Sequence, residues 1–142
     1  MLIDTGPMIA LADKGQSRHL ECAALVEQLP GILVTTWACL TEALYFLHGL
    51  RGWRGQDALW RYVEAQEILL HNPQADEAMR VYQLMRQYRD TPMDFADASL
   101  VSLAELSGAH QILTLDDDFF FYRINGQDLF EVLPTRTPKR TR

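Results

Sequence analysis

The sequence predicts an α/β fold, an α/β/α sandwich whose central, mostly parallel sheet has helices on both faces. Short apolar runs alternate along the chain with longer stretches of helical periodicity, and strands that are separated by helices tend to pair in parallel. The length of 142 residues, with 48% hydrophobic and 23% charged residues, fits one globular domain. We therefore expect one domain over residues 1–134 and a basic, disordered tail over 135–142.

The first half of the chain predicts two strands and three helices. Pro7 suits the first turn of a helix, and Ser17 is a favourable N-cap. The run that precedes Trp37 is rich in β-forming residues. In order, the predicted elements are a strand at 1–3, helices at 7–13 and 17–29, a strand at 31–35 and a helix at 37–48.

The second half predicts three helices and three strands. Gly108 follows an apolar helical stretch and suits its C-terminal cap. In order, the predicted elements are a helix at 53–65, a strand at 68–70, helices at 76–88 and 94–106, a strand at 111–115 and an edge strand at 129–133. In open parallel sheets, functional residues gather at the carboxyl ends of the strands. The residues that follow the strands are therefore the ones to inspect for function.

Two aspartates stand at that edge of the predicted sheet. Asp4 follows the first strand, and Asp116 ends the fourth and is followed by Asp117 and Asp118. Taken alone, Asp4 could be a helix N-cap and Asp116 a turn former. In a doubly wound strand order the first and fourth strands are neighbours, which would bring Asp4 and Asp116 side by side.

Asp94 and Asp97 open the helix predicted over 94–106. Spaced three residues apart, they lie on one face of the helix, and carboxylates suit the positive end of the helix dipole. Capping explains either residue alone. It does not explain the small, apolar face that follows Asp97, which we expect to be buried against the sheet.

Glu42 carries the only formal charge between positions 36 and 50 when histidine is counted as neutral. A helix that apolar is expected to be mostly buried, and a carboxylate there is costly unless it is paired or binds a metal. No Lys or Arg lies within one helical turn of it. A solvated position at the edge of the helix is the simpler alternative.

Acidic groups that converge without basic partners repel one another and raise one another's pKa. A hard divalent cation would relieve this repulsion. The chain has no cysteine–histidine cluster, and we expect Cys22 and Cys39 to be reduced and buried. Ligation by oxygen alone favours Mg²⁺ or Mn²⁺ over zinc. Such ions promote in-line displacement at a phosphoryl group.

Four short motifs resemble those of PIN-domain nucleases, in particular VapC-like toxins. The motifs are Asp4-Thr5-Gly6-Pro7, Thr41-Glu42, Asp94-Phe95-Ala96-Asp97-Ala98 and Leu113-Thr114-Leu115-Asp116-Asp117-Asp118-Phe119. They follow the order and spacing of the family from residue 1 to about 133. By this resemblance, the catalytic and metal-binding acidic quartet of the family is matched by Asp4, Glu42, Asp97 and Asp116.

The same resemblance implies supporting roles and partners. Asp94 and Asp118 match auxiliary acidic positions, and Thr5 and Thr114 match hydroxyl residues that stand beside the ligands. The implied activity is cleavage of single-stranded RNA that depends on Mg²⁺ or Mn²⁺. Many relatives are toxins held inactive by a small cognate antitoxin, and many form homodimers. We therefore expect RNA, an antitoxin and a second copy of the chain as partners.

A basic, aromatic segment is the candidate for contacting RNA. Arg51, Arg54 and Arg61 are interleaved with Trp53 and Trp60, a combination that can bind single-stranded RNA. The simpler alternative places Trp60 in the core and leaves the arginines solvated, and an antitoxin or second subunit could also dock here. The net charge is −6, or about −10 without the four cations of the last nine residues, which disfavours long-range attraction of RNA.

We expect a cytoplasmic protein, because no apolar run could span a bilayer and the chain opens without a basic signal-peptide region. Two other functional classes stay open. A non-catalytic RNA- or protein-binding module on a PIN scaffold would be expected to lack an acidic position. A phosphoaspartate phosphatase or receiver would need a lysine at a late strand end, and residues 113–121 contain none. A serine hydrolase is disfavoured because GxSxG is absent.

Overall fold

The structure is a computed structural model and describes residues 1–139. Helices and short strands alternate along these residues, as the sequence predicts. In chain order the elements are β1 (Leu2–Ile3), α1 (Thr5–Ala12), α2 (His19–Gln28), β2 (Leu33–Thr36), α3 (Trp37–Arg51), α4 (Trp53–Glu64), β3 (Ile68–His71), α5 (Glu77–Gln87), α6 (Phe95–Ser107), β4 (Gln111–Leu113), the 3-10 helix η1 (Asp117–Phe120), β5 (Arg123–Ile124), β6 (Asp128–Leu129) and β7 (Glu131–Leu133).

Five strands form one parallel sheet in the order β3-β2-β1-β4-β7. Leu2 of β1 pairs with Val34 on one side and with Ile112 on the other. The first strand therefore lies at the centre, beside β4, as the doubly wound order predicts. Strand β7 pairs with β4 at the edge of the sheet, where an edge strand was expected.

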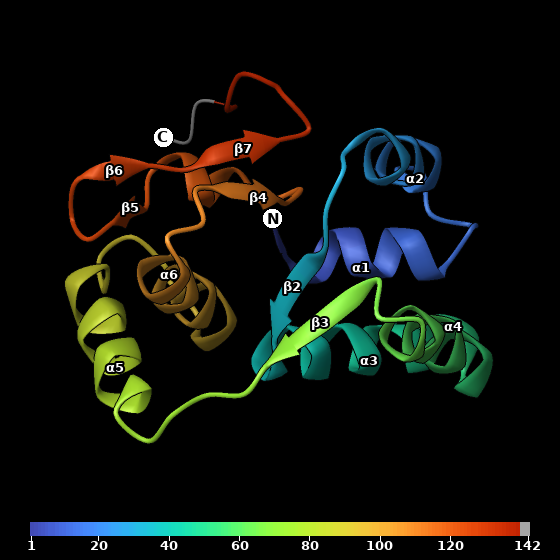
Figure 1. Ribbon diagram of the computed structural model, residues 1–142, viewed down its shortest axis with the longest axis horizontal. Helices are drawn as coiled ribbons and strands as arrows, with labels where there is room; N and C mark the ends of the chain where they lie inside the picture. Colours follow the sequence, from blue (N-terminus) through green and yellow to red (C-terminus); the bar gives the residue numbers. More distant parts are fainter. Residues whose placement is uncertain (140–142) are drawn as a thin grey trace.

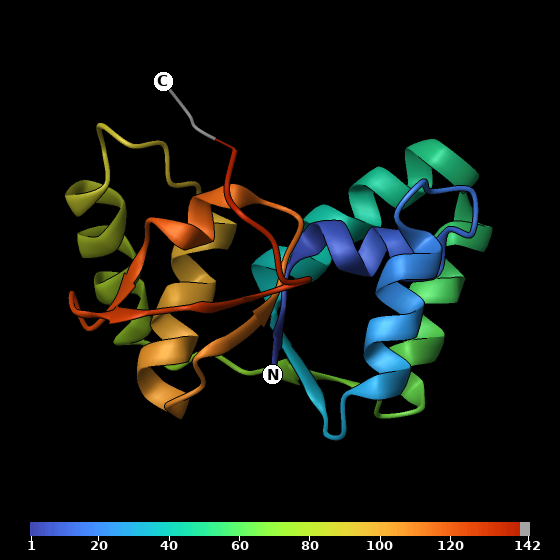
Figure 2. The same ribbon diagram turned by 90° about the horizontal axis from the view of Figure 1, so that it is seen from above.

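Helices cover both faces of this sheet (Figures 1 and 2). Helices α5 and α6 pack together on one face, and α1 packs with α2, α3 and α4 on the other. The predicted α/β/α sandwich is confirmed. The small apolar face of α6 is buried, as expected, through Ala98, Leu100, Val101, Leu103 and Ala104.

Capping residues account for where the first helices begin. Helix α1 begins at Thr5 rather than at residue 7, because Asp4 is its N-cap and accepts a hydrogen bond from Thr5 N at 2.7 Å. The expectation for Ser17 was wrong. Helix α2 begins at His19, and its N-cap Arg18 makes no side-chain capping bond.

Helix α3 is not buried all round, contrary to what its apolar sequence indicates. Its buried residues are Cys39, Leu40, Ala43 and Leu47. The large apolar side chains that it exposes are Trp37, Tyr45, Phe46 and Leu50. An apolar stripe of this kind on a folded domain often marks an interface.

A short antiparallel hairpin, β5 with β6, was not predicted. Its turn contains Asn125 and Gly126, both with positive φ, at 53° and 71°. Asn-Gly is a strong hairpin indicator because both residues tolerate that conformation. The Asn-Gly dipeptide therefore indicates a turn of this kind. The hairpin was missed because its strands are only two residues long.

The described part of the basic tail lies against the domain. The Arg136 guanidinium forms an ion pair with Asp117, Nε to Oδ1 at 3.0 Å, and Lys139 N donates to the same carboxylate. Arg136 also stacks over the Phe120 ring. The expectation of disorder falls in part on residues 140–142, which lie outside the described residues.

The two cysteines, Cys22 and Cys39, are free and buried, as expected. Within residues 1–139, none of the helices has the length and apolar character that crossing a membrane requires.

Candidate metal centre

Three helices begin at the carboxyl edge of the sheet, and an aspartate caps each of them. Asp4 follows β1 and caps α1, Asp94 caps α6, and Asp116 follows β4 and caps η1. Each carboxylate accepts a hydrogen bond from a backbone N–H at the start of its helix. Capping and a shared site are therefore compatible, because the caps bring the three carboxylates to one cavity.

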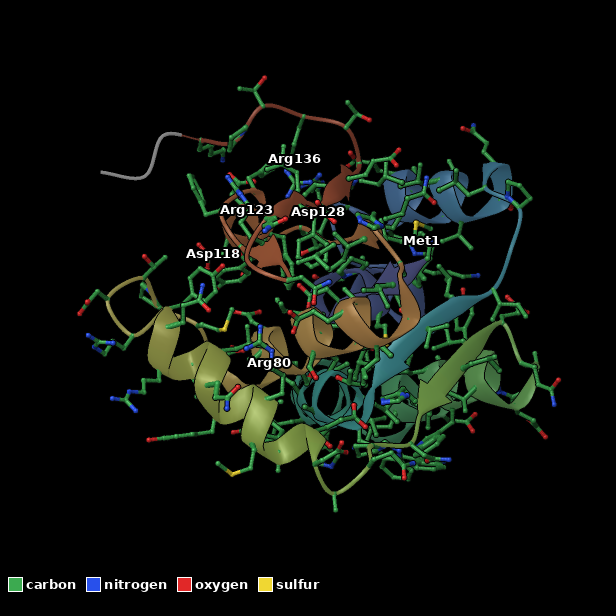
Figure 3. The ribbon with its side chains drawn as sticks, turned by 60° about the vertical axis from the view of Figure 1, so that its left-hand side comes forward. Met1, Arg80, Asp118, Arg123, Asp128 and Arg136 are labelled. Atoms are coloured by element: carbon green, nitrogen blue, oxygen red, sulfur yellow. The ribbon has the colours of Figure 1, made fainter. Side chains whose placement is uncertain are left out.

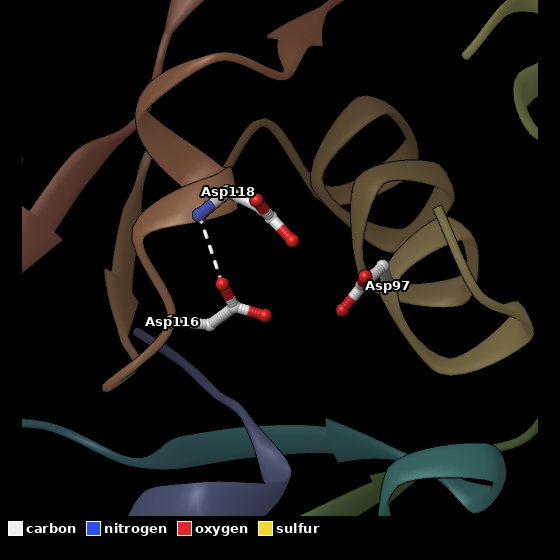
Figure 4. Close-up of side chains that lie close together, drawn as sticks. All are labelled: Asp97, Asp116 and Asp118. Atoms are coloured by element: carbon white, nitrogen blue, oxygen red, sulfur yellow. Dashed lines mark hydrogen bonds between the residues drawn. The ribbon is translucent and has the colours of Figure 1, made fainter. Parts of the chain in front are cut away.

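Asp97, Asp116 and Asp118 form a compact carboxylate group (Figure 4). One oxygen of each lies within 4.8 Å of the other two. Asp97 comes from the first turn of α6, and the other two follow β4, where Asp116 Oδ1 accepts a hydrogen bond from Asp118 N at 2.9 Å. Asp118, predicted as auxiliary, is thus in the group, whereas Asp4 and Glu42 line the cavity beside it.

Asp4 is buried, with 6% of its surface exposed. Its Oδ1 accepts a hydrogen bond from Thr5 N, and its Oδ2 accepts one from Thr114 Oγ1 at 2.7 Å. Burial raises the pKa of Asp4 to about 6 against these hydrogen bonds, and the carboxylates of Asp116 and Glu42 add to the rise. Thr114 is therefore a direct hydrogen-bond partner of Asp4, while the Thr5 hydroxyl donates to a backbone carbonyl of α3.

Asp97 is the most perturbed acid of the group. Its pKa is raised to about 8, first by burial and then by the carboxylates of Asp94 and Asp4. The Tyr122 hydroxyl lies 2.7 Å from Pro92 O and 3.1 Å from Asp97 Oδ2, and it shares its one proton between these two acceptors. In the absence of a cation, Asp97 therefore holds a proton at neutral pH.

Glu42 lies on α3 and lines the same open cavity, which has a volume of about 510 Å³. Its side chain is half-buried, so it is not the fully buried lone charge that the sequence indicates. Burial raises its pKa, and the carboxylates of Asp94 and Asp116 add to this. Glu42 is thus close to the other acids and reachable from solvent.

The cavity has an excess of negative charge. Every charged residue that lines it within the described chain is acidic, and of these only Asp117 has a basic partner, the Arg136 guanidinium. An oxygen-only set of carboxylates around one cavity is the donor chemistry of Mg²⁺ or Mn²⁺ rather than of zinc. The residues present therefore fit a hard divalent cation.

Two arginines fix the loop that carries Asp116 and Asp118, and both can be followed in Figure 3. Arg123 Nη1 donates to three consecutive backbone carbonyls at the end of η1. Arg136 holds Asp117 and also donates to a backbone carbonyl just before the loop. Because protein contacts shape this loop, its carboxylates are held in place without a cation.

The arginines predicted to contact RNA are not brought to this cavity. Arg51 forms an ion pair with Asp13 at the far end of α1, Nε to Oδ1 at 3.0 Å. Arg54 lines a separate cavity beside it, and Arg61 pairs with Asp57 on α4. Any contact of these side chains with RNA would lie at a distance from the carboxylates.

Sequence reasoning missed Tyr122, which is fully buried and contacts Asp97. Its spacing from the acidic motifs gives no indication of this contact, because the turn of η1 and the start of β5 bring it back to α6. A tyrosine four residues beyond an Asp-rich strand end would be noticed only once that turn is known.

The comparisons with solved structures agree on the fold. The structure of VapC20 from Mycobacterium tuberculosis, described as a sarcin-ricin loop cleaving toxin, matches with a TM-score of 0.76 at 20% identity, over 82% of this chain and 90% of that one. A chain of VapBC2 from Rickettsia felis, in a complex with a DNA fragment from its promoter, matches with a TM-score of 0.66 at 13% identity, over 92% and 96%.

No family model and no curated protein matches the sequence. At identities of 20% and below, the likeness to the solved structures shows the fold. The PIN-like fold that the motifs predict is therefore confirmed by structure, and the roles of the individual carboxylates are matters for experiment.

Proposed function

We propose that this protein is an endoribonuclease that depends on Mg²⁺ or Mn²⁺ and that it is the toxin of a toxin–antitoxin pair. The observation that carries the proposal is the carboxylate group of Asp97, Asp116 and Asp118, with Asp4 and Glu42 beside it, at a cavity that no basic residue of the described chain lines. The likeness of the fold to VapC20, a toxin that cleaves the sarcin-ricin loop, supports RNA as the substrate.

The residues suggest a division of roles. Asp97, Asp116 and Asp118 would hold the cation, and Asp4, buried and anchored by Thr114, would complete its negative surroundings. When bound, a divalent cation supplies positive charge for the phosphoryl oxygens and acidifies water. Glu42, half-buried with a raised pKa, would accept a proton from the attacking water.

An exposed apolar face supports the proposed protein partners, a cognate antitoxin and a second copy of the chain. Tyr45 and Trp53 are 76% and 64% exposed, and Phe46, which packs edge-on against Tyr45, lines the catalytic cavity. Apolar patches of this kind are usually covered in a complex. An antitoxin seated there would also reach the cavity. With RNA as its substrate, the protein would act in the cytoplasm.

A phosphoaspartate enzyme lacks comparable support, because no lysine lines the cavity within the described chain. A non-catalytic module on the same scaffold would not need the carboxylates that converge here. The choice between a nuclease and a binding module is a matter of activity, and the following assay addresses it.

The assay incubates the purified protein with single-stranded RNA in Mg²⁺, Mn²⁺, Zn²⁺ or EDTA. We expect cutting with Mg²⁺ or Mn²⁺ and none with EDTA. The Glu42→Gln variant should cut at least ~100-fold more slowly, and the exposed Glu64→Gln variant on α4 is the matched control. Cutting that survives EDTA, or a normal rate in well-folded Glu42→Gln, would reject the assignment.

A further inference from the structure

A second cavity lies beside the catalytic one, at the carboxyl ends of β2 and β3. It has a volume of about 560 Å³ and is enclosed by α3, α5 and α6. The start of α6 divides the two cavities: Asp94 lines the catalytic one, and Phe95 lines the second. Consecutive Cα atoms are about 3.8 Å apart, so the two sites are next to each other along one edge of the sheet.

Two aromatic side chains of this second cavity are open to solvent. Trp37 is 49% exposed and Phe95 is 59% exposed. The Trp37 indole is oriented by a hydrogen bond from its Nε1 to Asn72 Oδ1 at 3.1 Å. Neither ring is among the aromatic pairs found within residues 1–139. Both residues therefore offer exposed aromatic surface on which a planar ligand can stack.

Polar groups at the base of the cavity complement these rings. Ser102 is only 2% exposed, and none of the hydrogen bonds between described residues involves its hydroxyl. His71 Nε2 is hydrogen-bonded to Glu77 Oε1 at 2.8 Å, and no other acidic or basic residue of the described chain lines this cavity. The cavity thus offers hydrogen-bonding groups without an unpaired charge, which suits a neutral polar ring better than a phosphate.

We propose that this second cavity binds one unstacked nucleobase of the RNA, next to the phosphodiester that is cut. The inference rests on the proposed ribonuclease function and deepens it. Proteins that read single-stranded RNA splay bases out, stack them on aromatic rings and hydrogen-bond their edges. Trp37 and Phe95 provide the stacking faces, and Ser102 provides a buried hydroxyl for the edge of the base.

The charge of the site favours a base over a protein segment as the occupant. The backbone of the RNA would follow the cation at the carboxylates, and the base would turn into the adjacent neutral cavity. A second copy of the chain remains the competing occupant, because exposed aromatic rings also occur at protein interfaces. The test is therefore designed to separate RNA from a second copy.

The experiment measures the affinity of a labelled single-stranded 12-nucleotide RNA in Mg²⁺, in the Asp97→Asn background so that cutting does not interfere. Phe95→Ala and Trp37→Ala should each weaken binding by about 5- to 150-fold, the range for losing one stacked base. Tyr82→Ala on α5 is the matched control, since Tyr82 is 56% exposed and lies outside the lining.

A blocking variant avoids the catalytic residues altogether. Ala78 is exposed on α5 and lines the cavity, so Ala78→Trp should fill it and weaken RNA binding to the same extent. Met79→Trp, at the neighbouring exposed position outside the lining, should bind normally. An RNA with an abasic site beside the cut should bind wild type more weakly but bind Ala78→Trp without further loss.

The outcomes separate this inference from the proposed function. If wild type cuts RNA while Phe95→Ala, Trp37→Ala and Ala78→Trp bind it normally, the base-binding site is rejected and the ribonuclease stands. If these variants instead change the oligomeric state by light scattering and leave RNA binding intact, the cavity is a protein interface. A wild type that cuts no RNA overturns the proposed function and this inference with it.

Discussion

Asp4 and Asp13 stand at the two ends of α1 and are equally buried, at 6% and 4% exposure. Asp13 accepts hydrogen bonds from the side chain of Gln16, from a backbone N–H and from Arg51, and these lower its pKa. Asp4 has no cationic partner among the described residues, and burial, with a smaller contribution from the carboxylates of Asp116 and Glu42, raises its pKa to about 6. The helix dipole alone would give Asp4 the lower pKa of the two, because it stabilises ionised carboxylates at the N-terminus of a helix.

The difference between the two ends shows that burial does not by itself mark a functional carboxylate. A buried acid with a cationic partner, such as Asp13 with Arg51, is a structural ion pair. A buried acid whose neighbours are acids, such as Asp4, implies a missing positive charge. The same contrast occurs within one loop, where Asp117 is held by Arg136 while the pKa of its neighbour Asp118 is raised by burial and by Asp116.

The largest expected effect is a difference in activity between a variant in the acidic cavity and a variant of Asp13, at the other end of α1. Asp116→Asn should lower the rate of RNA cutting at least ~100-fold, because it removes an oxygen donor for the cation. Asp13→Asn should cut RNA at close to the wild-type rate and lose about 1 kcal/mol of unfolding free energy, since it weakens the ion pair with Arg51. Single-turnover cutting and urea unfolding measure both. Equal activity of the two variants would remove the distinction.

The second prediction concerns stabilisation by the cation. Mg²⁺ at a hundredfold excess over its dissociation constant should stabilise the wild type by about 2.7 kcal/mol, because the scattered carboxylates of the unfolded chain do not bind it. Asp97→Asn should lose most of this gain, and Asp13→Asn should keep it. Melting curves with Mg²⁺ and with EDTA are the measurement, and an undiminished gain in Asp97→Asn would contradict the ligand assignment.

The third prediction follows from the raised pKa of Asp97. Its pKa rises from 3.8 to about 8 on folding, so the folded protein binds more protons than the unfolded chain between these values. The contribution of Asp97 to the free energy of unfolding of the metal-free protein should therefore be greatest near pH 4. It should fall as the pH rises toward 8. Asp97→Asn should flatten this fall. Urea unfolding of both proteins in EDTA from pH 5 to pH 8 tests this prediction. If the stability of the wild type and of Asp97→Asn changes with pH in the same way, the raised pKa of Asp97 is contradicted.

The smallest expected effect concerns Tyr122, a positioning residue for Asp97. Its hydrogen bond opposes the rise in the pKa of Asp97. Tyr122→Phe should therefore move the pH at which cutting rises to a higher value and reduce cutting several-fold at pH 7, with a loss of about 1 kcal/mol in stability. A pH–rate profile measures this. A change in stability with an unmoved profile would mean that Tyr122 only fills the core.

Much of the fold could be predicted, because helical periodicity and β-forming runs are local properties of the sequence. That β1 and β4 are neighbours in the sheet could be predicted from the strand order of doubly wound sheets. Ser17 misled because its side chain makes no capping bond, which only the tertiary course of the chain decides. The exposure of Tyr45 and Phe46 on α3 was equally hidden, because an apolar sequence does not say whether the domain itself or a partner covers it.

The candidate site was predicted in outline rather than in detail. Asp4, Asp97, Asp116 and Glu42 do line one cavity, because residues that follow parallel strands meet at one edge. The sequence could not show which carboxylates lie closest together, because the turn of η1 brings Asp118 into the compact group. Distances of a few ångströms between side chains depend on such turns.

Binding of Mn²⁺, measured by titration calorimetry at pH 8, tests the central claim most directly. The pKa of Asp97 is about 8, so at this pH its proton competes less with the cation than at neutral pH. Wild type and Asp13→Asn should bind the ion with the same affinity. Asp116→Asn should bind it at least ~10-fold more weakly, the loss expected when a metal site is disturbed. A wild type that binds no Mn²⁺, or an Asp116→Asn variant that binds it equally well, would contradict the account of the acidic cavity as a metal centre.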